Sequence, residues 1–117
     1  MARVVAFIPD LLFGSNVIGA LRAGGHEPVL VSRSEDLPGA LDGAEVLVVD
    51  LTAEVPARLE VVRPLLGAGG ARPRTLAFFS HVETDVRAAA QEAGFDLVVP
   101  RSRMARAGAE LVEQLAG

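Results

Sequence analysis

Five apolar runs of strand length alternate with segments of helical periodicity along this 117-residue chain. The strands predicted from these runs span 4–8, 29–31, 45–50, 75–79 and 97–99. Strands that read as continuous apolar runs are typical of a parallel sheet, because both faces of such a sheet are covered. The intervening periodicity and turn residues predict helices over 15–23, 34–41, 56–66, 84–93 and 102–116.

The regular alternation of strands and helices predicts an α/β fold built on one parallel sheet. Because crossovers between parallel strands are right-handed, the leading topology is a flavodoxin-like, doubly wound five-stranded sheet with helices on both faces. A chain of this length makes one domain, and its glycine-rich stretch 67–70 lies between two predicted elements. We therefore expect residues 1–117 to form a single domain.

Composition excludes several kinds of site and partner. The chain has no cysteine and two histidines, which excludes disulfides, thiolate metal sites and a histidine cage. All eleven basic residues are arginine, so chemistry that needs a lysine is excluded as well. The net charge of −4 does not indicate nucleic-acid binding. The apolar runs are too short to span a bilayer and no signal peptide is visible, so a cytoplasmic protein is expected.

Polar residues follow the predicted strands at the points where the strands end. In a doubly wound sheet the carboxyl ends of the strands form the edge at which ligands bind. The candidate site residues at this edge are Asp10, Asp50, Ser80, His81, Arg101 and Ser102.

Asp50 directly follows the apolar run 46–49, and Ser80 directly follows the run 75–79. Together with the alanine-rich helix and the strand that come after Ser80, this order resembles a response-regulator receiver (CheY-like) domain over the whole chain. In that family the aspartate accepts a phosphoryl group beside a Mg²⁺ ion, and the hydroxyl binds the phosphate. The resemblance therefore implies Asp50 as phosphoacceptor, Ser80 as switch residue, and Asp10 with Asp50 as an incomplete set of Mg²⁺ ligands.

The chain departs from the receiver pattern at several signature positions. Asp10 stands alone where receivers carry two adjacent acids, and Mg²⁺ requires several oxygen ligands in near-octahedral geometry. Pro100 stands where the family has its phosphate-binding lysine, with Arg101 as its neighbour, and Leu97 replaces an aromatic residue. The chain thus resembles a stand-alone, atypical receiver, or pseudo-receiver, with a degraded phosphorylation site.

The acidic and hydroxyl candidates each have a structural interpretation as well. Asp50 can cap the following turn through Thr52, and Asp10 can cap the turn that begins at Leu11. The hydroxyl of Ser80 can bind local main-chain groups.

The remaining candidates are basic or lie at a helix start. His81 can titrate near neutral pH or bind an anion, or it can be a solvated loop residue. Arg101 and Arg103 can clamp a phosphate or carboxylate at the start of the last predicted helix, or can simply face solvent. Ser102 is expected to cap that helix.

Three functions remain open at this point. The first is a pseudo-receiver that binds an unidentified partner protein, or a second copy of itself, through residues 84–116. The second is a variant receiver that is phosphorylated on Asp50 with Mg²⁺ and uses Arg101 in place of the lysine. The third is a binder of small anionic ligands built from Asp10, Ser80, Arg101 and Ser102. No nucleophile–base pair indicates hydrolysis, so we expect a binding role rather than catalysis.

Overall fold

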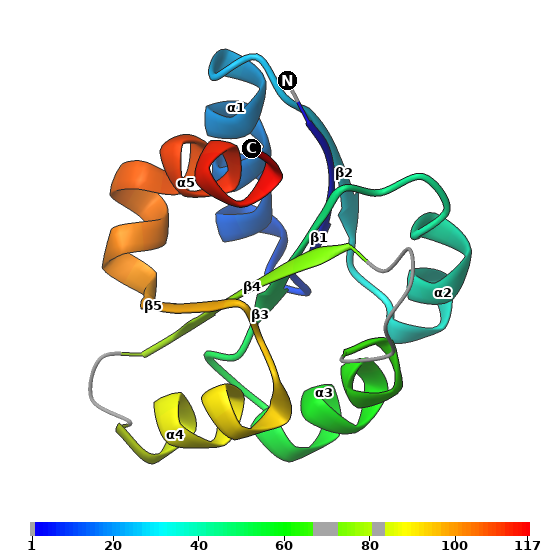
Figure 1. The fold of residues 1–117 in the computed structure, drawn as a ribbon, viewed down its shortest axis with the longest axis vertical. Coiled ribbons are helices and arrows are strands. Elements are labelled where there is room, and N and C mark those ends of the chain that lie inside the picture. Colours follow the sequence, from blue (N-terminus) through cyan, green and yellow to red (C-terminus); the bar gives the residue numbers. More distant parts are fainter. Residues whose placement is uncertain (1, 67–72, 81–83) are drawn as a thin grey trace.

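The computed structural model describes residues 2–66, 73–80 and 84–117 (Figure 1). In chain order the elements are β1 (Arg3–Phe7), α1 (Leu11–Ala23), β2 (Glu27–Val31), the short 3-10 helix η1 (Ser34–Asp36), α2 (Leu37–Ala40), β3 (Val46–Asp50), α3 (Val55–Val62), the 3-10 helix η2 (Arg63–Leu65), β4 (Arg74–Phe79), α4 (Thr84–Ala93), β5 (Leu97–Pro100) and α5 (Arg101–Ala116).

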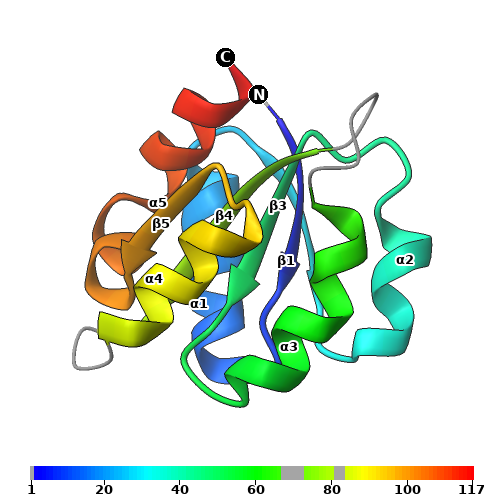
Figure 2. The same cartoon turned by 60° about the horizontal axis from the view of Figure 1, so that its bottom comes forward.

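The strands form one five-stranded parallel sheet in the order β2-β1-β3-β4-β5. Figure 2 shows β1, β3, β4 and β5 side by side in this order. The prediction of a flavodoxin-like, doubly wound sheet with helices on both faces is therefore confirmed. The register pairs Asp50 with Phe78 and Phe79 with Pro100, so the ends of β3, β4 and β5 lie next to one another. These three ends carry most of the candidate residues.

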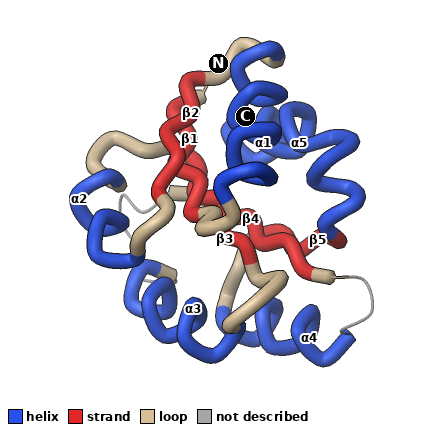
Figure 3. Tube along the Cα trace, turned by 180° about the vertical axis from the view of Figure 1, so that it is seen from behind, coloured by secondary structure: helices blue, strands red, loops and turns tan. Residues whose placement is uncertain are grey.

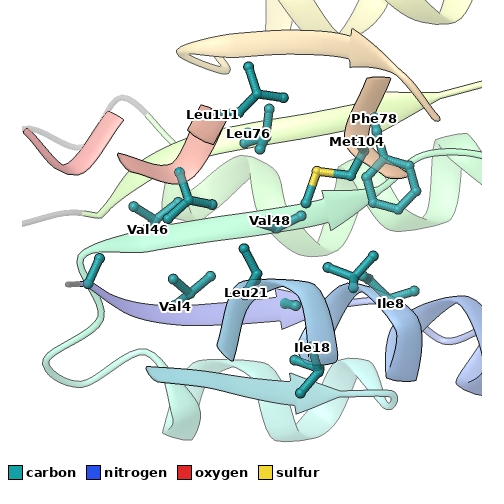
Figure 4. Close-up of a cluster of buried hydrophobic side chains, with 14 of the residues drawn as sticks. Val4, Ile8, Ile18, Leu21, Val46, Val48, Leu76, Phe78, Met104 and Leu111 are labelled. Atoms are coloured by element: carbon teal, nitrogen blue, oxygen red, sulfur yellow. The ribbon is translucent and has the colours of Figure 1, made fainter. Parts of the chain in front are cut away.

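Helices cover both faces of the sheet, with α1 and α5 on one face and α2, α3 and α4 on the other (Figure 3). Alternate residues of each strand point to opposite faces of the sheet and pack into two separate hydrophobic cores. Val46 and Val48 of β3, for example, pack under α1 and α5, together with Leu21 and Met104 (Figure 4). Because both faces of the central strands are buried, their sequences need no polar alternation.

Two helices begin or end away from their predicted positions. α1 begins at Leu11 rather than Ser15, because the Asp10 carboxylate accepts the main-chain N–H of Phe13 at 3.1 Å and caps an extra turn. The helix predicted over 56–66 divides into α3 and η2 at Arg63. Pro64, which has no N–H to continue the α-helical ladder, immediately follows this break.

A buried histidine joins the start of β1 to α5. His26 is 5% exposed, and its Nδ1 lies 3.1 Å from the main-chain nitrogen of Ala2. Its Nε2 lies 3.1 Å from the carbonyl oxygen of Ala109. The N–H of Ala2 can only donate and the carbonyl of Ala109 can only accept, so the bonded form of His26 is neutral with its proton on Nε2.

α5 has an irregular turn near its middle. Ala107 departs from helical geometry with φ −135° and ψ 24°. The helix continues after it, and the buried residues Leu111 and Val112 of its second half pack into the core.

Candidate functional site at the carboxyl edge

Asp50 ends β3 and is buried, with 2% of its surface exposed. Its Oδ1 accepts the main-chain N–H of Thr52 at 2.8 Å and the hydroxyl of Thr52 at 2.5 Å. An aspartate that bonds the main chain two residues later stabilises the turn in between. The predicted capping of this turn by Asp50 is confirmed.

The second carboxylate oxygen of Asp50 faces Arg58 from the first turn of α3. Nη1 of Arg58 lies 3.4 Å from Oδ2 of Asp50 and donates to the main-chain oxygen of Asp50 at 3.0 Å. The side chain of Arg58 is only 11% exposed. Breaking such a pair leaves an uncompensated charge in a dry environment, which is strongly destabilising.

Arg58 was not among the residues singled out from the sequence. One signal was present, because a cation in the first turn of a helix opposes the positive end of the helix dipole. A nearby carboxylate offsets this unfavourable interaction, and the strand that precedes α3 ends in Asp50. Only the packing of α3 against the sheet brings the two groups together.

Three candidates line a common cavity of about 470 Å³ at the carboxyl edge. They are Ser80, which follows β4, and Arg101 and Ser102 in the first turn of α5. Thr52, which binds Asp50, also lines this cavity, whereas Asp50 itself does not. Asp10 is not a lining residue either, because its carboxylate caps α1. His81 lies outside the described residues.

Arg101 lies over an aromatic ring at this cavity. Its guanidinium carbon is 4.1 Å from the centre of the Phe13 ring, which is cation–π contact distance. Phe13 packs in turn against Phe78, with ring centres 5.3 Å apart. The interaction orients the guanidinium without neutralising its charge.

The expectation that Ser102 caps the last helix is wrong. β5 runs directly into α5, so Pro100 takes the cap position with φ −65° and ψ 152°, and no side chain caps the helix. Ser102 is the second residue of the helix. With no linking residue between strand and helix, the helix starts earlier than the sequence suggested.

The donor groups at this edge do not fit a Mg²⁺ ion. Asp50 already bonds Thr52 through one carboxylate oxygen and Arg58 through the other, and a cationic guanidinium repels a second cation. The Asp10 carboxylate is taken up by the N–H of Phe13. Across the described ranges, no three His, Cys, Asp or Glu side chains are grouped so that they could hold a metal ion.

Within residues 2–66, 73–80 and 84–117, no helix has both the length and the apolar character needed to cross a bilayer.

No family model and no curated protein matches the sequence. Solved structures do match the fold. A response regulator from Thermotoga maritima superposes with a TM-score of 0.81 at 14% identity, covering 99% of this chain and 98% of that chain. A response regulator receiver protein from Burkholderia phymatum gives 0.82 at 17% identity, with 100% and 96% coverage.

A third match is a protein described as an atypical orphan response regulator with a phosphorylation-independent regulatory mechanism. It gives a TM-score of 0.78 at 17% identity, and the match covers 97% of this chain and 94% of that chain. At these identities the matches show the fold alone. The chain therefore has the receiver-domain fold along its length.

Proposed function

We propose that this chain, which has the receiver-domain fold, is a cytoplasmic signalling module that binds a partner protein without phosphoryl chemistry, that is, a pseudo-receiver. The observation that carries the proposal is the environment of Asp50. Thr52 and Arg58 engage both of its carboxylate oxygens, and the residue is buried. A carboxylate held in this way is a structural group.

Phosphoryl transfer to Asp50 would require three further things. The carboxylate would have to be released from Arg58 to attack a phosphodonor. A divalent cation would have to bind where a guanidinium already lies. The developing phosphoryl charge would also need a cation in the place of the family's lysine, where this chain has Pro100. Together these requirements favour a non-phosphorylated module.

One of the matching structures supports this proposal by analogy. The atypical orphan response regulator is described as working by a phosphorylation-independent mechanism. The same mode of action, transferred to this chain, would need the fold and a binding surface but no chemistry at Asp50.

The proposed binding surface consists of α4, β5 and α5. β5 is an edge strand of the sheet, so this face is not covered by a further strand. Arg87 of α4 and Arg106 of α5 are exposed on these helices. The occupant would be a partner protein or a second copy of the chain.

Phosphorylation can be tested directly. The protein is incubated with acetyl phosphate and Mg²⁺, or with beryllofluoride and Mg²⁺, and followed by intact mass and by amide NMR spectra. We expect no phosphoryl adduct and no spectral change, with a conventional receiver domain as positive control. An adduct that disappears in Asp50→Asn but persists in Asp10→Asn would instead establish a variant receiver phosphorylated on Asp50.

Partner binding is tested by pull-down from the source organism, with light scattering to detect a homodimer. Reversing an exposed charge by Arg87→Glu should weaken capture or self-association. Arg22→Glu changes another exposed arginine, on α1, and is the matched control that should have no effect. Equal losses in both variants would contradict the proposed surface.

A specific observation favours a second candidate function, the binding of a small anionic ligand. Ser80, Arg101 and Ser102 come from two separate segments and meet at one cavity. Asp10, which was expected to belong to this site, is not part of it. Binding at this cavity would be compatible with a structural role for Asp50.

A further inference from the structure

A second cavity, of about 240 Å³, lies in the seam between α1 and α5. Its walls are mostly apolar, with Phe13, Val17 and Ala20 on the α1 side and Met104, Ala105 and Gly108 on the α5 side. The two helices lie side by side on one face of the sheet (Figures 1 and 3). The cavity is therefore a local opening in an otherwise packed helix pair.

The two ends of this helix pair differ in how closely the helices approach. At the end of α1, a Cβ on Gly24 would lie 2.6 Å from the Cβ of Ala109, so the helices are in tight contact there. The irregular turn at Ala107 lies between Ala105, which lines the cavity, and Ala109 of the tight contact; Gly108, which follows the turn, lines the cavity as well. Irregular turns inside helices often occur at functional positions. The small side chains of Ala20 and Ala105 leave the opening unfilled.

The apolar cavity adjoins the cavity at the carboxyl edge of the sheet. Phe13 and Ala105 line both of them. The guanidinium of Arg101 lies over Phe13 at this boundary, and among the described residues Arg101 forms no ion pair. An apolar chamber thus opens beside an arginine whose charge is not neutralised.

We propose that the two cavities together form a binding site for a small amphipathic anion, namely a straight-chain carboxylate of medium length. The hydrocarbon chain would occupy the seam between α1 and α5, and the carboxylate would lie beside Arg101 and the hydroxyl of Ser102. This inference rests on the anionic-ligand function and names its ligand class. It does not depend on whether Asp50 is phosphorylated.

The chemistry of the two cavities supports this class of ligand. A guanidinium binds a carboxylate in a planar, two-bonded geometry, and the start of a helix also favours a negative charge. The apolar walls favour methylene groups, each of which contributes a roughly fourfold gain in affinity when buried. The edge cavity falls within the usual range of small-molecule sites, and the smaller apolar cavity restricts the tail to a short chain.

The test is a calorimetric titration of the whole chain with acetate, butanoate, hexanoate and octanoate, and with octanol and inorganic phosphate. Affinity should rise about fourfold with each methylene until the apolar cavity is full. Octanol should bind more weakly than octanoate, because it lacks the charge. Phosphate should bind weakly or not at all, because it has no tail.

Two variants, each with a control, test separately the binding of the ligand's carboxylate and of its hydrocarbon chain. Arg101→Gln should weaken octanoate binding at least about tenfold and leave octanol unchanged. Arg103→Gln, an exposed position on the same helix that lines neither cavity, is its control and should bind as the wild type. Ala20→Leu should fill the apolar cavity, weakening octanoate binding while leaving acetate unaffected. Ala23→Leu makes the same change on α1 away from both cavities and should have no effect. Circular dichroism verifies that each variant is folded.

The outcomes distinguish this inference from the function on which it rests. Equal binding of acetate, phosphate and octanoate would support a simple anion site and overturn the amphipathic ligand. Binding of no anion at all would overturn both. Octanoate binding that survives unchanged in Arg101→Gln or in Ala20→Leu would also overturn the inference, because the ligand would then lie elsewhere.

Discussion

Arg58 in α3 and Asp50 at the end of β3 form a partly buried ion pair that also includes a main-chain contact. The guanidinium lies 3.4 Å from the carboxylate and donates to the carbonyl oxygen of the same aspartate at 3.0 Å. The pair therefore connects the start of a helix to the end of a central strand. Asp50 is also the residue that the resemblance to receiver domains singles out as the phosphoacceptor candidate.

Removing the arginine should destabilise the protein more than removing both partners. We expect Arg58→Met to lower the free energy of unfolding by about 3 kcal/mol, because the buried Asp50 charge loses its counter-ion. In the double variant Asp50→Asn, Arg58→Met, no buried charge remains, so the loss should be smaller than the sum of the single losses. Urea unfolding of the four proteins measures this coupling, which should be about 1 kcal/mol or more. Strictly additive losses would show that the ion pair is not an energetic unit.

The buried imidazole of His26 should be a structural group that stabilises the attachment of α5 to β1. Replacement by Leu removes the acceptor for the Ala2 N–H and the donor for the Ala109 carbonyl. Removing the partner of the buried Ala2 N–H and of the partly buried Ala109 carbonyl should lower the free energy of unfolding by about 1–3 kcal/mol, measured by urea unfolding. His26→Asn can keep an acceptor near Ala2 and should lose less. If His26→Leu and His26→Asn lower the free energy of unfolding equally, the loss of stability would come from packing and not from hydrogen bonding.

The hydroxyl of Thr75 should stabilise the start of the β4–β5 pair. Thr75 Oγ1 donates to Oδ2 of Asp96 at 3.1 Å and accepts the main-chain N–H of Asp96 at 3.0 Å. Thr75→Val has nearly the same shape but removes both bonds, so it should lower the free energy of unfolding by about 1–2 kcal/mol. Thr75→Ser keeps the hydroxyl and is the control. A valine variant as stable as the serine variant would contradict the role of this hydroxyl.

An exposed ion pair at η1 should be visible in titration but not in stability. The hydrogen bond from Arg33 lowers the pKa of Glu35 below its usual value, with the charge of Arg33 and a main-chain hydrogen bond acting in the same direction. Any stability from a lowered carboxyl pKa is present above the unfolded-state value and is lost as the pH falls through the folded-state value. NMR titration should show the pKa of Glu35 rising in Arg33→Gln, with no measurable change in unfolding because the pair is exposed. If the titration curve of Glu35 were the same in Arg33→Gln as in the wild type, the hydrogen bond between Arg33 and Glu35 would be contradicted.

Several features of the fold and the site could be predicted because their signals are local. Continuous apolar runs indicated strands buried on both faces, and the alternation with helices indicated the parallel sheet. Capping by Asp10 and the turn formed by Asp50 with Thr52 were also predictable, because each joins residues two or three positions apart. Ser80, Arg101 and Ser102 could be assigned to one edge of the sheet because they follow the ends of predicted strands, and the carboxyl ends of parallel strands lie at the same edge.

Contacts that depend on how whole helices pack could not be predicted in the same way. The pairing of Arg58 with Asp50 depends on how α3 packs against β3, and the bonds of His26 depend on where α5 crosses the start of β1. Because β5 joins α5 directly, Pro100 and not Ser102 takes the cap position. Sequence periodicity does not locate the first residue of a helix to within one or two positions.

The amino-acid sequence by itself determined which segments become strands and helices and at which edge the polar groups gather, because burial and periodicity act residue by residue along the chain. Only the tertiary structure decided which of those groups touch, and where α1 and α5 separate to leave a cavity. Those distances arise from the packing of helices that are far apart in the sequence, and no local pattern encodes them.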